Sequence, residues 1–243
     1  MKLKKLIIPA IYILLGSIIV SCDKDSGPIK GQGPIVEQSF VLPTISAIDL
    51  NIDANVILTH GESEEVRIQG QQNIIDNIEK YITSDGYWNI TYFKNVRNHD
   101  GITIHITSPL VDYISISGSG SVNSTNLFAD SVNVYLNISG SGNISFNTAA
   151  QLTESYISGS GEVYLSGSSF EHRIHISGSG SVRAFNFPTH VTHIDISGSG
   201  NSEVNVSDLL DVKISGSGNV YYIGYPQITS DISGSGEIHN ANK

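Results

Sequence analysis

The sequence predicts an all-β protein whose chain winds as a right-handed parallel β-solenoid with coils of about 20 residues. Three observations support this fold class. The tetrapeptide Ser-Gly-Ser-Gly occurs seven times between Ser117 and Gly236, an isoleucine precedes every copy, and successive copies start 18 to 22 residues apart. A fixed period of this length is typical of stacked repeats, in which each coil packs only on its neighbours.

The composition suits strands and turns and excludes several function classes. Charged residues make up only 15% of the chain, and the formal net charge is −10, so a basic surface for nucleic acid is not expected. The chain has one cysteine, Cys22, which excludes an internal disulfide and a cysteine-based zinc site. We therefore expect no nucleic-acid partner, no metal site and no cofactor.

Residues 1–21 have the pattern of a secretory signal. A short basic start is followed by the apolar run 6–20, which is too short and too unevenly flanked for a membrane span. The run ends in Ile-Val-Ser-Cys, which resembles the lipobox of bacterial lipoproteins, where the cysteine becomes the lipidated first residue. The alternative is an ordinary signal followed by an unmodified thiol. We expect residues 1–21 to be a lipoprotein signal peptide and acylated Cys22 to anchor the protein in a lipid bilayer.

Residues 22–34 are rich in Asp, Lys, Gly and Pro and show no hydrophobic periodicity, so they are expected to form a flexible tether after the lipid anchor. The folded domain is then expected to span residues 35–240. This organisation predicts a Gram-negative cell-envelope location, as an outer-membrane lipoprotein that is periplasmic or exposed on the surface.

The first part of the domain alternates apolar and polar residues in short segments. Period-two patterns predict strands at 47–52, 55–59, 66–68, 88–92 and 102–106, and Ile74, Ile75 and Ile78 are spaced for one helical turn. The segments VILTHG (56–61), SDGYW (84–88) and IHITSP (104–109), together with VYYIGYP (220–226) near the end, resemble the family called putative auto-transporter adhesin, head GIN domain. The resemblance covers about residues 35–240. It implies a secreted β-solenoid, commonly on a lipoprotein, with no agreed catalytic residues.

Because side chains alternate along a β-strand, the position of each repeat residue predicts whether it faces the core or the solvent. The isoleucine before each copy and the Val or Ile five residues after its first serine share one parity and should face inward, with the two glycines leaving space at a bend. The serines should face outward. Ser202 interrupts the inward Val/Ile column, and a bulge at 201–203 would let Val204 replace it. The opposite wall of the core is expected to be filled by Leu127, Leu152, Phe170, Phe187 and Leu209.

The outward residues that precede each copy differ from coil to coil, so the candidate binding face lies there. Stacking would align them as two polar columns, in which exposed tyrosines could stack on sugars. The candidate residues are Tyr113, Tyr135, Tyr156, Arg173, His175, His193, Asp195, Asp211, Lys213 and Asp231.

The leading hypothesis is a non-catalytic, lipid-anchored adhesin, a surface binding or structural module, whose partner is a glycan, a matrix component or a surface protein. The alternative is a polysaccharide lyase or hydrolase that uses Asp195 and Asp231, which would lie about 9.6 Å apart, two strand spacings. A simple Asp-Lys-Asp charge ladder through Lys213 explains the same residues. A passive envelope component is a third reading. His175 and His193 share a face in neighbouring columns, which is a weak basis for a metal site.

Overall fold

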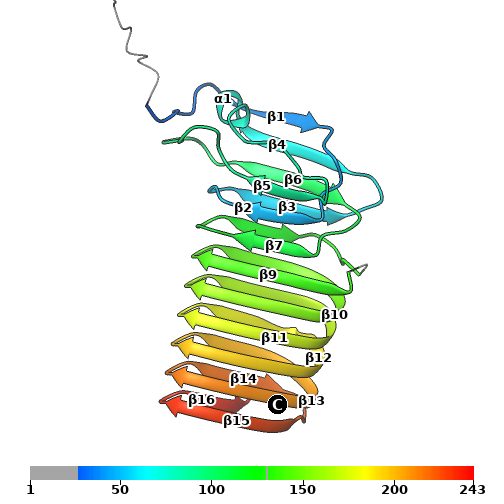
Figure 1. Ribbon diagram of the computed structural model, residues 1–243, viewed down its shortest axis with the longest axis vertical. Helices are drawn as coiled ribbons and strands as arrows, with labels where there is room; N and C mark the ends of the chain where they lie inside the picture. The colour runs from blue at the N-terminus through cyan, green and yellow to red at the C-terminus, as the bar shows by residue number, and fades with distance from the viewer. Residues whose placement is uncertain (1–26, 130) are drawn as a thin grey trace, which may run out of the picture.

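The computed structural model describes residues 27–129 and 131–243. The expected signal peptide and Cys22 therefore lie outside the described residues. The described chain forms a β-solenoid of about 7 turns with coils about 19 residues apart. From residue 113 onward the coils follow one another in chain order and in the right-handed sense towards the bottom of Figure 1, whereas the strands at 87–90 and 103–108 lie above those at 47–50 and 55–60. The predicted fold class is confirmed.

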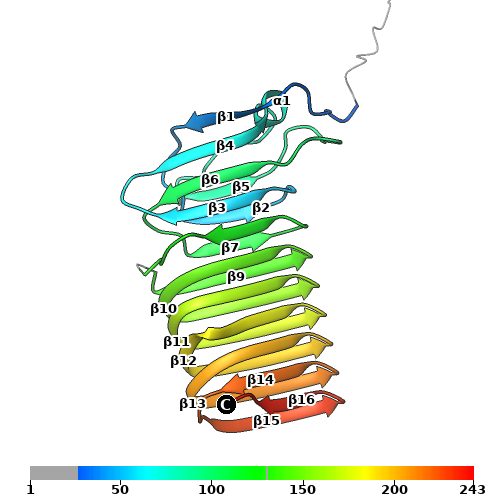
Figure 2. The same cartoon turned by 180° about the vertical axis from the view of Figure 1, so that it is seen from behind.

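The solenoid has two faces, which we call face A and face B. Four long strands begin on face B, pass around one edge without a break and end on face A (Figures 1 and 2). They are β10 (Asn143–Gly159), β11 (Glu162–Gly178), β12 (Ser181–Gly198) and β13 (Asn201–Gly216). Face A continues with β5 (Tyr87–Ile90), β2 (Ala47–Leu50), β7 (Tyr113–Ile116) and β9 (Asn133–Gly140) on one side and β15 (Gln227–Gly234) on the other.

Face B is extended in the same way by shorter parallel strands. Towards the N-terminus these are β8 (Ser121–Ser124), β3 (Asn55–His60) and β6 (Thr103–Ser108), and towards the C-terminus they are β14 (Asn219–Ile223) and β16 (Glu237–Asn240). The strands expected in the first half of the domain are thus present, within a few residues at each end.

An antiparallel cap closes the N-terminal end. β1 (Ile35–Phe40) pairs antiparallel with β4 (Glu65–Gln71), and β4 pairs antiparallel with β6. The helical turn expected near Ile74 is α1 (Gln72–Ile75). The side chains of Ile74, Ile75 and Ile78 are fully buried, so this turn fills the end of the core.

The isoleucine ladder is present in register. The isoleucine before each Ser-Gly-Ser-Gly copy lies beside the isoleucine of the next coil from Ile116 to Ile232. The first six are 0–2% exposed. At roughly 1.5–3 kcal/mol for each buried side chain, these six contribute on the order of 10 kcal/mol before the entropy of ordering the chain is counted.

The two glycines of the motif serve different purposes. A Cβ on Gly161, the second glycine of its copy, would lie 2.5 Å from the Gly142 carbonyl oxygen and 2.6 Å from Ile138 Cγ2, so this position leaves room for both the backbone and the isoleucine of the preceding coil. Gly159, the first glycine, has a φ of +139°, and a Cβ there would lie 2.4 Å from the carbonyl oxygen of Gly140. Glycine is therefore needed both for a left-handed backbone and for close stacking of coils.

Two expectations about the core were wrong. Ser202 does not sit beside a bulge: it lies in register between Val182 and Val220, its side chain is fully buried, and its Oγ has no hydrogen-bond partner. Of the residues expected on the opposite wall, Phe187 is fully buried and Leu152 and Leu209 are half-buried, whereas Leu127 and Phe170 are 43% and 52% exposed. The opposite wall is built instead by face B, through residues such as Ile144, Phe146, Val163, Leu165 and Val182.

The described part of the expected tether is held against the domain. Ile29 forms a parallel bridge with Val96, and the Gly31 N–H donates to the Asn98 carbonyl at 3.2 Å. The Asn73 amide nitrogen donates to the Lys30 carbonyl at 2.7 Å. Residues 27–34 thus do not form the free segment that their Gly and Pro content suggested, because residues far along the chain supply their hydrogen-bond partners. Within the described ranges, no helix has the length and apolar character needed to cross a membrane.

Candidate binding face

The two outward columns of face A are aligned as the repeat spacing predicts. Column 1 contains Tyr113, Tyr135, Glu154, Arg173, His193, Asp211 and Thr229, and each residue lies beside the next in register. Column 2 contains Ser115, Asn137, Tyr156, His175, Asp195, Lys213 and Asp231 in the same way. Because neighbouring strands are parallel and unshifted here, the columns run along the solenoid axis.

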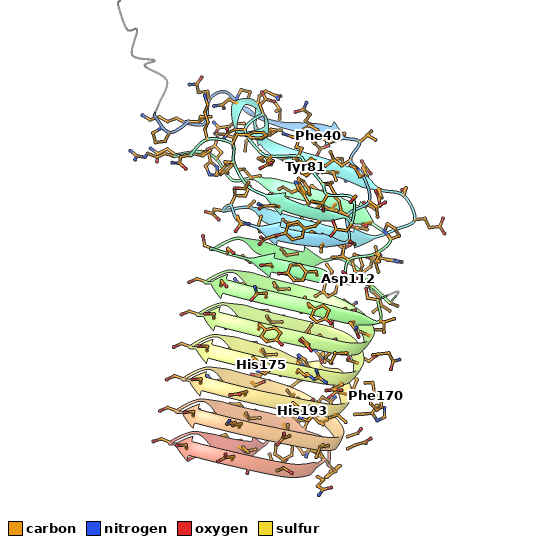
Figure 3. The ribbon with its side chains drawn as sticks, viewed as in Figure 1. Phe40, Tyr81, Asp112, Phe170, His175 and His193 are labelled. Atoms are coloured by element: carbon orange, nitrogen blue, oxygen red, sulfur yellow. The ribbon has the colours of Figure 1, made fainter. Side chains whose placement is uncertain are left out.

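A groove of about 560 Å³ crosses the upper half of these columns. Five of the ten candidate residues line it: Tyr113, Tyr135, Tyr156, His175 and Asp195. His175 and His193 both lie on the near face in Figure 3. The groove extends from β7 to β12, which is four strand spacings or roughly 19 Å. It is therefore long enough for an extended ligand.

The aromatic side chains of the groove are held in place by contacts with their neighbours. The rings of Tyr156 and His175 stack with centroids 4.8 Å apart and planes 8° apart. The Tyr156 hydroxyl donates to Glu154 Oε2 at 2.8 Å, and this hydrogen bond raises the pKa of Tyr156, so its phenol stays neutral. Tyr135 and Tyr156 are 38% and 39% exposed. They thus present apolar ring surface beside polar groups, an arrangement that suits sugar rings.

Four polar residues that line the groove are absent from the candidates that the sequence indicates. Asn137 lines the groove, as do Ser158, Ser177 and Ser197 of the repeat motif. Asn137 belongs to the same column as Tyr156, so its position in the repeat could have identified it. The serines could not be selected in this way, because every copy of the motif supplies outward serines and only the groove distinguishes those near the tyrosines.

Arg173, His193 and Asp211 lie beside the groove, where Arg173 and His193 contact acidic side chains. Arg173 Nη1 is 3.3 Å from Glu154 Oε1, and its Nε is 2.6 Å from Glu171 Oε1. His193 lies between Glu171 and Asp211, with N–O distances of 3.8 and 3.3 Å. These contacts orient the three side chains, and the two glutamates neutralise the charge of Arg173, which reduces its capacity to bind an ionic ligand.

The two carboxylates of the hydrolase hypothesis do not meet in the groove. Lys213 lies between Asp195 and Asp231 in register, which is the alternating charge ladder. Among the residues that line the groove, Asp195 is the one carboxylate, and Asp231 belongs to the last coil outside it. Most glycosidases use two carboxyl groups that face the same scissile bond, and the groove does not bring Asp195 and Asp231 together as such a pair.

The histidines do not assemble into a metal centre. His175 stacks on Tyr156, and His193 faces Glu171 and Asp211. His172 points into the core, where it is 1% exposed, while His190 lies on the surface beside Asp208. Over residues 27–129 and 131–243, no group of three or more His, Cys, Asp or Glu side chains is arranged to hold a metal ion.

The fold and the groove define the chain as a β-solenoid with a tyrosine-lined groove on face A. A family model described as putative auto-transporter adhesin, head GIN domain, matches residues 45–226. The chain belongs to this family, as the sequence resemblance indicated.

Solved structures share the fold. A putative adhesin from Bacteroides fragilis is 25% identical, with a TM-score of 0.80 over 87% of this chain and 99% of that one. A putative adhesin and a putative lipid binding protein, both from Parabacteroides distasonis, are 19% and 20% identical, each with a TM-score of 0.71. They cover 88% and 89% of this chain and 99% and 100% of their own, respectively. No curated protein matches the chain.

Proposed function

We propose that this protein is a non-catalytic, lipid-anchored adhesin of the bacterial envelope whose face A groove binds an uncharged oligosaccharide. The observation that carries the proposal is the row of tyrosines in one groove, with Tyr156 fixed by His175 and Glu154. Sugar rings stack on aromatic faces, while Asn137 and Asp195 offer hydrogen-bond partners for hydroxyl groups. The net charge of −10 disfavours acidic glycans.

A glycan-binding screen tests the proposal directly. The chain from residue 22 onward, with Cys22→Ser to prevent oxidation, would be applied to an array of neutral and acidic oligosaccharides, and hits measured by calorimetry. We expect micromolar binding to a neutral oligosaccharide. Tyr156→Ala should weaken it about tenfold, since one stacked aromatic contributes roughly 0.5–1.5 kcal/mol beyond its buried area.

Tyr164→Ala is the matched control. Tyr164 is 40% exposed, like Tyr156, and its hydroxyl also donates to a nearby glutamate, Glu162, but it lies in the face B part of β11. Equal losses in the two variants, or no saccharide bound at micromolar concentration, would contradict a groove that binds glycans. Cleavage of a bound polysaccharide that disappears in Asp195→Asn would contradict the non-catalytic assignment.

The lipid anchor is a separate part of the proposal and rests on the signal pattern and on Cys22 as the chain's one cysteine. Labelled palmitate fed to expressing Gram-negative cells should be incorporated into the protein and should not label Cys22→Ser. Protease treatment of intact cells then distinguishes a surface location from a periplasmic one. Release of unlabelled wild-type protein into the medium would refute the anchor without affecting the glycan-binding test.

A further inference from the structure

The two ends of the solenoid are built differently. Antiparallel β1 and β4 cover the N-terminal end, and α1 and its following turn fill the core there. At the C-terminal end, β15 pairs only with β13 and β16 only with β14 among the described strands. In Figures 1 and 2 no other strand lies beyond them. The outer edges of both strands therefore present unpaired N–H and C=O groups to solvent.

The apolar core is open at the same end. Ile232, the last residue of the isoleucine ladder, is 39% exposed, whereas Ile214 in the preceding coil is 1% exposed. Ile228 is also 39% exposed, whereas Leu210 beside it is fully buried. The residues after β16 do not cover this opening, because the Ala241 N–H donates to the Tyr222 carbonyl and Asn242 is bound to Gly224.

We propose that this open end is a docking surface for a second copy of the same chain, which joins it end to end. A two-fold axis perpendicular to both faces would carry face A onto face A while reversing the direction of its strands. β15 would then pair antiparallel with β15 of the second copy, and β16 with β16, through one symmetry operation. The exposed isoleucines of the two copies would meet between the paired layers and complete one continuous core.

Head-to-tail stacking does not satisfy this surface. The N-terminal end has its core filled by Ile74, Ile75 and Ile78 and presents β1, which runs antiparallel to the neighbouring β4. The outer edge of β1 is unpaired, but the outer edge of β5 carries an antiparallel bridge between Ile82 and Trp88, and the core behind both strands is filled. This end therefore lacks the open core and the pair of free parallel edges that the C-terminal end would need. The contact is self-complementary, so one two-fold operation uses up the open edges and the open core of both C-terminal ends and leaves no further C-terminal surface to bind.

The symmetry has a consequence that rests on the proposed anchor. Eleven strands follow one another from β1 to β16, a distance of about 48 Å at the usual strand spacing. In the dimer, the two N-terminal ends lie at opposite tips, roughly 100 Å apart. Chains anchored through Cys22 in two different membranes would thus meet at their distal ends, and the contact would join the two surfaces.

Sedimentation velocity on the chain from residue 22 onward with Cys22→Ser tests the dimer. We expect a concentration-dependent monomer–dimer equilibrium. Ile232→Lys, which places a charge in the open core, should weaken dimerisation roughly tenfold or more. Val132→Lys is the control, because Val132 is 66% exposed and lies away from this end. A monomer at all concentrations, or equal loss in both variants, would overturn the proposal.

Cross-linking keeps the proposal testable if Ile232→Lys disturbs the last coil. In the Cys22→Ser background, Asp231→Cys places an exposed thiol in β15 at the proposed contact. Tyr164→Cys places an exposed thiol on face B, away from the contact. Mild oxidation should yield a disulfide-linked dimer of the Asp231→Cys protein with retained strand content and no comparable dimer of Tyr164→Cys. Equal cross-linking of the two would count against the docked end.

Bridging is tested separately on vesicles that carry the chain from residue 22 onward, coupled through the thiol of Cys22 to a maleimide lipid. Coupled vesicles should aggregate, and vesicles carrying Ile232→Lys should stay dispersed. Dimers in solution without vesicle aggregation would overturn the bridging arrangement. Neither readout involves a saccharide or acylation in the cell, so the result is independent of the proposed glycan binding and lipidation.

Discussion

His172 gives the solenoid a specific sensitivity to acid. It points inward from the face A part of β11, is 1% exposed, and packs edge-on against Phe187 with ring centroids 5.6 Å apart. Its Nε2 lies 3.0 Å from Ser155 Oγ, while its Nδ1 has no hydrogen-bond partner in the described structure. Burial lowers the pKa of His172 from its ordinary value of 6.5 to about 3, because no acid offsets the cost of a buried charge.

The loss of stability follows from proton uptake by the unfolded chain. As the pH falls below 6.5, His172 binds a proton in the unfolded state but stays neutral in the folded state. The free energy of unfolding therefore falls by about 1.4 kcal/mol per pH unit until the folded-state pKa near 3 is reached. The contribution lost is about 2 kcal/mol at pH 5 and on the order of 5 kcal/mol near pH 3.

His172→Leu isolates this effect, since Leu210 occupies the same inward column two coils away. Urea unfolding of both proteins would be followed by circular dichroism at pH 7.5 and pH 5. Carboxylates contribute equally to both, so wild type should lose about 2 kcal/mol more than the variant over this interval. Equal losses, or an imidazole that titrates near 6.5 by NMR in the folded protein, would refute the reasoning.

Three further predictions concern stability and are checked by thermal denaturation. Gly216→Val should lower the free energy of unfolding by about 2–4 kcal/mol, because the φ of Gly216 is +138° and a Cβ would lie 2.3 Å from the Gly198 carbonyl oxygen. Gly118→Ala is the control and should change it by less than about 1 kcal/mol, because no atom lies within 4 Å of the new Cβ. Similar shifts in the two variants would contradict the stacking argument. Ser202→Val should stabilise the protein by about 1 kcal/mol, since it removes a buried unpaired hydroxyl from a column of valines, and a lower melting temperature would show that the hydroxyl has a partner. Arg183→Met should cost less than about 1 kcal/mol, because Arg183 pairs with Glu162 and Glu203 at the surface, and a larger loss would mean that these pairs are shielded from solvent.

The sequence predicts part of the candidate site, and the rest depends on the folded structure. Repeat spacing alone predicts that Tyr156, His175 and Asp195 share one column, because residues at the same position in successive coils must stack. The stack of Tyr156 on His175 and its hydrogen bond to Glu154 depend on side-chain rotamers, which spacing does not determine. The groove that selects five of the ten candidates is likewise a property of the assembled face.

The sequence by itself determined the coil period, the isoleucine ladder and the outward columns, because strand parity and a repeat near 20 residues leave one register in which the apolar residues face inward. Only the tertiary structure decided how the ends are formed. In the cap, β1 pairs with β4 and β4 pairs with β6, and each pair joins segments that are distant in the sequence. All three strands lie outside the Ser-Gly-Ser-Gly repeat. The hydrophobicity of Phe170 predicts a core position, but the side chain lies at the edge of the solenoid, because the long strands pass around that edge and carry it outward. Local pattern fixes which side of a strand a residue faces, whereas the path of the whole chain fixes what covers that side.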